Sequence, residues 1–234
     1  MKKIANLIFI SLLSSLSLKA QEWDPSKITR DIQWTFRMSQ GADSLGFSRI
    51  EIKKIGEQLL LSEDAEVPGF SEDLFVYVNP KDLSTDSTLI VGRLSGFPVE
   101  CKIVVTNGVA KGYANFPKHP SRPTVNVNFP ITPTTKFRAQ SFFFSPFYRD
   151  LTEGKSFSYD QFNAMDGQKR TIQAKVVGSE KVSIGDQIYD TFKLELSGGV
   201  AEQNIFIEKT NPRIVKMSFR DTPWKYEIIE SQSF

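Results

Sequence analysis

Cysteine and histidine are almost absent from this chain of 234 residues, which contains one of each. The single cysteine, Cys101, cannot form an internal disulfide or a cysteine-based zinc site. The single histidine, His119, lies between prolines in a polar segment, where a lone imidazole is usually solvated. No Ser-His-Asp or Cys-His system can be assembled without that ring. We therefore expect no catalytic residue, no metal site and no cofactor, and a protein that is not an enzyme.

The chain also lacks any run of one charge sign. It contains 29 Lys and Arg against 27 Asp and Glu, a net charge of +2. Three of the lysines, Lys2, Lys3 and Lys19, lie in the first 20 residues, so their removal would leave 26 basic residues against the 27 acidic ones, a net charge of −1. This balance argues against nucleic acid as a partner, because such binding needs a basic surface.

Long apolar runs are missing except at the start of the chain. Residues 1–20 combine two lysines, an apolar stretch at 4–16 and Ala20 before a cleavage point, which is typical of a secretory signal peptide. A retained membrane anchor is the alternative, but the stretch is shorter than the roughly 20 residues that a helix needs to span a bilayer. No cysteine lies near the cut, so there is no lipobox. We expect residues 21–234 to be periplasmic or secreted and not membrane-spanning.

Alternating apolar and polar residues run through the rest of the chain, most clearly at 169–231. Such alternation places successive side chains on opposite faces of a sheet. Each run is short and ends at Gly, Pro, Asn or Asp. The best hairpin signal is Asn107-Gly108, a pair that suits a type I′ turn between strands at 99–106 and 109–116.

Three segments interrupt this pattern. Residues 62–73 are polar and contain Pro68-Gly69, which indicates a loop. Five prolines fall within residues 117–133, which predicts an extended crossing with one edge strand at 125–129. Residues 139–149 are rich in phenylalanine without strict alternation, which favours a short helix broken at Pro146. We count ten to twelve strands in one all-β, mainly antiparallel domain over 21–234, with a barrel, half-barrel or sandwich as its architecture.

The unusual compositional feature is aromatic content, with 19 Phe, 6 Tyr and 3 Trp. These rings either fill a plain core or line a cavity for an apolar ligand. Sequence alone favours the plain core. Carboxylates are plentiful, and Asp64, Glu66, Glu72 and Asp73 fall in or beside the predicted loop, where solvation is their expected role. A secreted hydrolase with paired acids is therefore the third-ranked hypothesis.

The C-terminal third carries a series of turn and strand motifs. They are LTEGK at 151–155, FSYDQF at 157–162, VVGSEKV at 176–182, YDTFKL at 189–194, IFIE at 205–208 and NPRIVK at 211–216. In this order they resemble the exported domain-of-unknown-function family 3108, over about residues 138–230. The N-terminal half is similar only in layout.

The resemblance implies a fold like that of the periplasmic lipoprotein carriers LolA and LolB. That fold is a strongly curved antiparallel half-barrel, open on one side and covered by a short helix or loop. The candidate lid residues are Phe142, Phe143, Phe144 and Phe147. The family offers no catalytic residues. Because no lipid-modified cysteine follows the signal, a free carrier fits better than a membrane-tethered one.

Our leading hypothesis is an exported binding protein that holds a lipid or acyl chain in a cavity of several hundred Å³. The candidate lining residues are Trp34, Phe36, Ile50, Ile52, Phe192, Leu194, Met217, Phe219, Trp224 and Tyr226. The alternative is a structural module of the cell envelope that binds a protein partner through strand edges or an aromatic patch.

Overall fold

One curved sheet accounts for nearly all of the structure. The computed structural model describes residues 22–233, so the predicted signal peptide at 1–20 lies outside the described residues. The strands are β1 (Ile32–Gln40), β2 (Asp43–Ile55), β3 (Gln58–Val67), β4 (Phe70–Val78), β5 (Thr85–Leu94), β6 (Phe97–Thr106), β7 (Val109–Asn115), β8 (Val125–Pro130), β9 (Lys136–Phe137), β10 (Ser156–Asn163), β11 (Gln168–Ile184), β12 (Gln187–Ser197), β13 (Gln203–Glu208), β14 (Ile214–Phe219) and β15 (Trp224–Ser233). The helices are the α-helix α1 (Arg138–Phe143) and the 3-10 helices η1 (Pro25–Lys27) and η2 (Ser145–Phe147).

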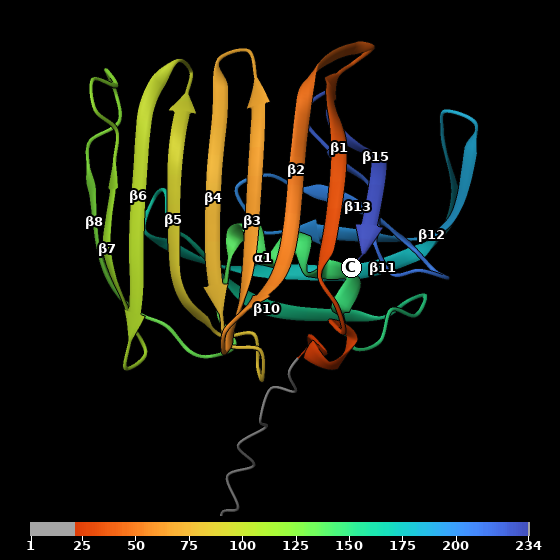
Figure 1. Cartoon of the computed structure of the whole chain (residues 1–234), viewed down its shortest axis with the longest axis horizontal. Helices are drawn as coiled ribbons and strands as arrows, with labels where there is room; N and C mark the ends of the chain where they lie inside the picture. Colours follow the sequence, from red (N-terminus) through yellow and green to blue (C-terminus); the bar gives the residue numbers. More distant parts are fainter. Residues whose placement is uncertain (1–21, 234) are drawn as a thin grey trace, which may run out of the picture.

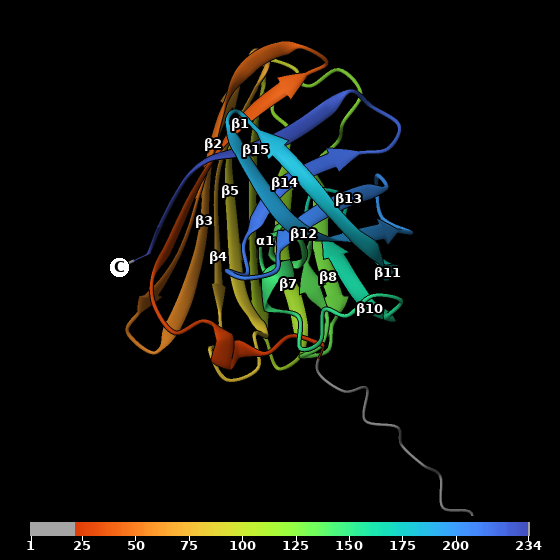
Figure 2. The same ribbon diagram turned by 90° about the vertical axis from the view of Figure 1, so that its right-hand side faces the viewer.

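The first and last strands meet in the middle of the sheet. The order is β8-β7-β6-β5-β4-β3-β2-β1-β15-β14-β13-β12-β11-β10-β9, so β1 pairs with both β2 and β15. Strands β1 to β8 form one wall, and β10 to β15 form a second wall whose strands cross behind the first (Figure 1). A view at right angles shows the walls facing each other with α1 between them (Figure 2). The all-β half-barrel predicted from the sequence is therefore confirmed, as one unclosed, mostly antiparallel sheet with one short α-helix.

Several local predictions are also confirmed. Asn107 and Gly108 have φ angles of 51° and 73°, the two positive values that a type I′ turn requires. The proline-rich crossing at 117–133 contains one strand, β8, which lies at an edge of the sheet. The phenylalanine-rich segment forms α1 and then η2, with Pro146 inside η2.

The strand count was too low, and the loop predicted at 62–73 was wrong. The described chain has 15 strands, because β3 continues to Val67 and β4 begins at Phe70, leaving only Pro68-Gly69 as the turn. Charged residues occupy both faces of these strands, so the alternation that identifies a strand was hidden. In β11 the register shifts at a bulge between Val176 and Gly178, and the strand continues through this glycine.

The core lies on the concave side of the sheet. Alternate residues of β1 and β2, including Trp34, Phe36, Ile50 and Ile52, are buried there. They form one continuous cluster with Phe143, Phe144 and Phe147 of the helical segment and with the inward residues of β10 to β15. The helical segment lies between the walls (Figure 2). Its aromatic rings pack in one cluster with side chains of both walls.

Two glycines on the concave face allow neighbouring strands to approach closely. A Cβ at Gly92 of β5 would lie 1.9 Å from the carbonyl oxygen of Ser71 in β4, and one at Gly46 of β2 would lie 2.0 Å from that of Glu66 in β3. Any other residue would force the strands apart. Glycine at such points lets a sheet bend sharply toward its concave side.

We expect Gly92→Ala to destabilise the fold by about 2 kcal/mol or more, since overpacking against a backbone atom has no side-chain rotation to relieve it. The measurement is the urea midpoint of unfolding. The control is Val91→Ala, one residue away on the exposed outer face, with an expected change within about 0.5 kcal/mol. Equal losses in the two variants would contradict the close-approach argument.

Candidate functional site

A pocket lies between α1 and the concave face of the sheet. Its volume is about 130 Å³. Apolar side chains from both walls and the helix line most of it, among them Leu74, Val76, Ile90, Phe142, Met217 and Phe219. The ionisable side chains of Glu63, Glu72, Arg138 and Tyr226 and the polar side chains of Thr88, Asn163 and Gln203 line the rest. The pocket therefore has an apolar surface and a group of ionisable residues at one interior site.

The loop between β4 and β5 fixes the position of α1. Leu83 in this loop is fully buried and has a φ of 53°, which is unusual for a residue with a side chain. Its carbonyl oxygen accepts hydrogen bonds from Gln140 Nε2 and Lys136 Nζ, both at 2.6 Å. Thr85 Oγ1 donates to Gln140 Oε1 at 2.7 Å. These side-chain contacts hold α1 over the pocket without a long helix or a disulfide.

The two glutamates come from adjacent strands. Glu63 of β3 pairs with Leu74, and Glu72 of β4 pairs with Ala65, so the glutamates are diagonal neighbours on the concave face. Diagonal neighbours of this kind lie about 7–8 Å apart between Cα atoms. Glu63 is 7% exposed, and its Oε1 accepts a hydrogen bond from Ser48 Oγ at 2.8 Å. Glu72 is half-buried. Two carboxyl groups thus share one interior pocket.

Burial makes it costly to ionise both groups. It raises the pKa of Glu63 to about 8, with a further increase from the neighbouring Glu72, while Ser48 and Arg138 lower it. Burial likewise raises the pKa of Glu72, against the opposing charge of Arg138. Burial and the two glutamates hold the pKa of Tyr226 well above its usual value. At neutral pH, the Glu63 carboxyl group therefore favours its protonated form.

Arg138, the first residue of α1, supplies the positive charge. Its guanidinium carbon lies 5.6 Å from the centre of the Phe142 ring. Among residues 22–233 it forms no direct ion pair with either glutamate, although its charge acts on both. The three charged groups therefore surround the pocket without neutralising one another by contact.

The structure brings only part of the predicted lining set to this pocket. Met217, Phe219 and Tyr226 line it, as do Phe142 and Phe143 of the predicted lid. The remaining predicted residues lie elsewhere: Trp34, Phe36, Ile50, Ile52, Leu194, Phe144 and Phe147 are buried in the core, and Phe192 and Trp224 are half-buried. A ligand-binding role for these residues stays a prediction, as does a lid-like movement of α1.

Sequence reasoning missed Glu63 and Arg138, and it expected Glu72 to be solvated beside a loop. The signal that could have found Glu63 is the pattern Leu61, Glu63, Ala65 and Val67, which alternates with the half-buried Ser62 and the exposed Asp64 and Glu66. Read as a strand, this pattern places Glu63 on the apolar face. Nothing in the sequence places Arg138 opposite it, because that depends on how α1 packs between the walls.

The single histidine, His119, and the single cysteine, Cys101, do not line the pocket. The His119 ring lies 4.9 Å from the Phe97 ring, and its Nδ1 accepts a hydrogen bond from the Ser121 backbone at 3.3 Å. Cys101 is buried, and burial raises the pKa of its thiol to about 12, so it stays protonated. Within residues 22–233, no three His, Cys, Asp or Glu side chains gather to hold a metal ion. No helix in the same range is long and apolar enough to cross a membrane.

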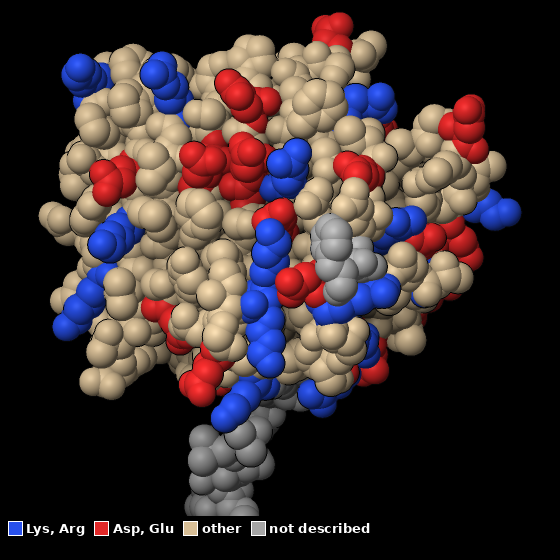
Figure 3. Space-filling model, in the orientation of Figure 1, with Lys and Arg blue, Asp and Glu red and all other residues tan. Residues whose placement is uncertain are grey.

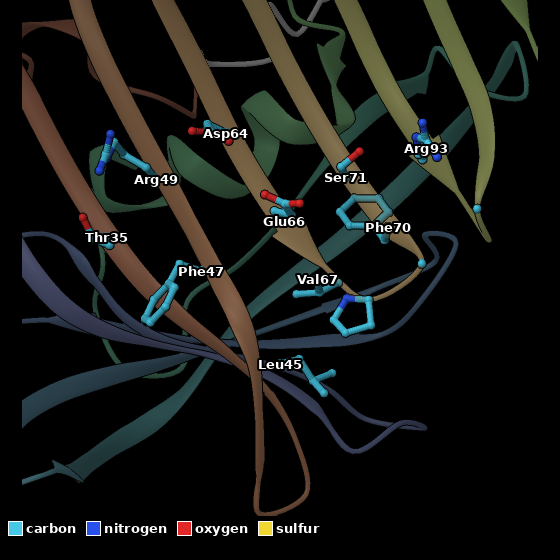
Figure 4. Close-up of a pocket in the computed structure, with 13 residues that line it drawn as sticks. Thr35, Leu45, Phe47, Arg49, Asp64, Glu66, Val67, Phe70, Ser71 and Arg93 are labelled. Carbon is cyan, nitrogen blue, oxygen red and sulfur yellow. The ribbon is translucent and has the colours of Figure 1, made fainter.

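A larger hollow, of about 1150 Å³, lies on the outer face of β1 to β5 (Figure 4). Its lining includes Phe47, Arg49, Asp64 and Glu66. Phe47, Arg49, Asp64 and Glu66 are exposed. The outer face mixes Lys and Arg with Asp and Glu, and neither sign covers it (Figure 3). We therefore take the interior pocket, where burial changes the chemistry of the side chains, as the candidate site.

Comparison with known proteins supports the fold. The chain is similar to a crystal structure of a β-barrel-like protein of domain of unknown function DUF1849 from Brucella abortus. The TM-score is 0.55 at 7% sequence identity, over 88% of this chain and 98% of that chain. No family model and no curated protein matches the sequence. At 7% identity this similarity shows a β-barrel-like fold alone, so the pocket residues must be interpreted from their own chemistry.

The stability of the protein should depend on pH through Glu63. An acid whose pKa rises on folding binds more protons in the folded state, so its contribution is complete below about pH 4.5 and is lost as pH rises toward about 8. The side chain of Glu63→Gln can still accept a hydrogen bond from Ser48. We expect the free energy of unfolding of this variant to decrease less than that of the wild type as pH rises, by on the order of 1–3 kcal/mol.

The measurement is the urea midpoint at pH 5 and pH 8 for wild type and variant. Glu66→Gln on the exposed face of the same strand is the matched control and should follow the wild-type curve. If Glu63→Gln shows the same decline as wild type, the burial argument for Glu63 is wrong.

Proposed function

We propose that this chain is an exported, non-enzymatic binding protein that holds an apolar ligand in its half-barrel. The ligand would be a lipid, an acyl chain or another small amphiphile. The observation that carries this proposal is the pocket beneath α1, where apolar side chains from both walls and from the helix surround about 130 Å³ of space. A pocket lined mainly by apolar and aromatic groups, with a few polar ones, is the usual form of a small-molecule site.

The pocket is smaller than the several hundred Å³ expected from the sequence. At about 130 Å³ it has room for the equivalent of roughly four water molecules. It would therefore receive one end of a ligand, and a complete acyl chain would enter only if α1 moved away. The hydrogen bonds of Gln140 to Leu83 and Thr85 are the contacts that such a movement would break. This gives the lid hypothesis a specific mechanism.

The cellular location and the resemblance to family 3108 are also parts of the proposal. Residues 1–20 support export to the periplasm or beyond, because they have the charged start and short apolar core of a signal peptide. The motifs at 151–216 support a likeness to family 3108 and to the LolA and LolB carriers. The β-barrel-like neighbour is compatible with that interpretation at the level of fold alone.

The acid pair favours a second candidate, a glycoside hydrolase. Such enzymes use two carboxyl groups about 5–10 Å apart, one of them with a raised pKa. Glu63 has the raised pKa, and its diagonal position to Glu72 places their Cα atoms about 7–8 Å apart. We rank this function second, because a pocket of about 130 Å³ does not admit a sugar ring together with its leaving group. Glu63-dependent hydrolysis of nitrophenyl glycosides would reverse this order.

Filling the pocket should abolish ligand binding. Ala139 lines the pocket from α1, and Ala139→Phe would occupy much of the free volume. The experiment is native mass spectrometry of the protein purified from its exported fraction, followed by solvent extraction of bound molecules. We expect a lipid-sized mass on the wild type and none on Ala139→Phe.

Ala42→Phe makes the same chemical change in an exposed turn and should keep the bound mass. Circular dichroism establishes that each variant is folded. A wild-type protein that carries no mass, even after incubation with envelope lipids, would contradict the proposal and favour the alternative, an envelope module that binds a protein partner.

A further inference from the structure

We propose that the acidic end of this pocket binds an alkylammonium group, so that the ligand is a cationic amine or an amphiphile with an amine headgroup. The proposal rests on the proposed function, because it assigns the chemistry of the ligand to the same pocket. The observation behind it is the juxtaposition of Glu63, Glu72 and Arg138 around one space, with no ion pair between them in the described chain.

Another glutamate in the same sheet provides the internal comparison. Glu227 of β15 is 8% exposed, almost the same as Glu63 at 7%. Glu227 accepts hydrogen bonds from Arg37 at 3.1 Å and Lys225 at 3.2 Å. Burial alone would raise its pKa, but these two cations bring the pKa below its ordinary value. A structural acid in this protein is thus paired with cations at contact distance.

Glu63 lacks such a pair. Within residues 22–233, the Glu63 side chain accepts one hydrogen bond, from the neutral hydroxyl of Ser48 to Oε1. Its carboxyl group lines the pocket, so its second oxygen, Oε2, can accept a hydrogen bond from a bound group. Burying a carboxyl group without a cation is unfavourable, and it is retained most readily where a ligand supplies the missing charge. The same reasoning applies to Glu72, whose side chain accepts no hydrogen bond from residues 22–233 and lines the same pocket.

The balance of charge selects a cation over an anion. Two carboxylates against one guanidinium leave the ionised pocket with one excess negative charge. A bound ammonium would neutralise that excess, whereas a bound carboxylate or phosphate would add to it. The groups that face the site are Glu63 of β3, Glu72 of β4, Arg138 of α1 and Tyr226 of β15, and of these only Arg138 would oppose a cation.

The other lining residues suit an organic cation better than a metal ion. A divalent metal would prefer additional oxygen or nitrogen ligands, and the guanidinium of Arg138 would repel it. An ammonium on a short carbon chain can instead use both parts of the pocket. Its methylenes would contact Leu74 and Val76, and the Phe219 and Tyr226 rings line the same space and can interact with a cation through their faces.

Three probes of matched size test the charge preference. Butylammonium, 1-butanol and butanoate share one carbon chain and differ in charge, and chemical-shift titration of the purified protein measures each affinity. We expect butylammonium to bind at least tenfold more tightly than butanol, and butanoate to bind most weakly. The affinity for butylammonium should increase as pH rises from 6 to 8, because binding requires both carboxylates to be ionised, while that for butanol should stay constant.

Variants assign the preference to the acids. Glu63→Gln and Glu72→Gln should each reduce butylammonium binding to the level of butanol and leave butanol binding unchanged. Glu66→Gln, on the exposed face of β3, should leave both unchanged. Amide spectra establish that the variants remain folded. These results would also distinguish an effect on the pocket from a general loss of structure.

The outcomes separate this inference from the proposed function. Equal binding of butanol and butylammonium, or amine binding that does not depend on the glutamates, would overturn the inference and leave an apolar pocket in place. Failure of all three probes to bind would count against both. If butylammonium is preferred, dodecylammonium then tests whether the ligand is an amphiphile or a small free amine. Tighter binding of dodecylammonium than of butylammonium, together with shifts in the α1 amides, indicates an amphiphile. Equal or weaker binding indicates a small free amine.

Discussion

The pairing of β1 with β15 is the contact on which the rest of the structure depends. It joins Ile32 to Ser233 at one end and Gln40 to Trp224 at the other. Without it, the two walls would be separate sheets with two additional open edges. The inward side chains of β1 reinforce this seam because Trp34, Phe36 and Met38 are all buried, and Arg37 bonds to Glu227 across it. Since the paired residues are about as far apart in sequence as the chain allows, we expect this contact to form late in folding.

The seam also determines where the pocket lies. Once β1 and β15 are joined, the concave faces of the two walls enclose a space in which aliphatic and aromatic side chains form one continuous cluster. The chain supplies α1 and η2 to this space, and Gln140 and Lys136 secure them to the carbonyl oxygen of Leu83. The pocket is the part of the interior that remains beneath α1. Its size therefore depends on a six-residue helix held by side-chain hydrogen bonds, which are weaker constraints than the sheet around it.

The sequence predicts the fold better than it predicts the site, for a physical reason. Hairpins depend on local signals, so Asn107-Gly108 and the C-terminal alternation were sufficient to identify an antiparallel sheet. The prediction failed at 62–73, where charged residues occupy both faces of β3 and β4 and hide the alternation. That failure and the missed site have one cause, since Glu63 and Glu72 are the charged residues that point inward. Arg138 could not have been placed at all, because its position follows from tertiary packing.

Inward-facing charge where a strand should be apolar is thus the main clue to function in this chain. Glu227 and Glu63 differ in their surroundings: Glu227 is in contact with two cations, whereas Glu63 lies in the interior pocket and accepts a hydrogen bond from the neutral hydroxyl of Ser48. If burial served stability alone, an apolar residue at position 63 would pack as well without the cost of a carboxyl group that must hold its proton. A fold shared with a distant neighbour at 7% identity does not account for that residue. A ligand that carries a positive charge into the pocket would account for Glu63.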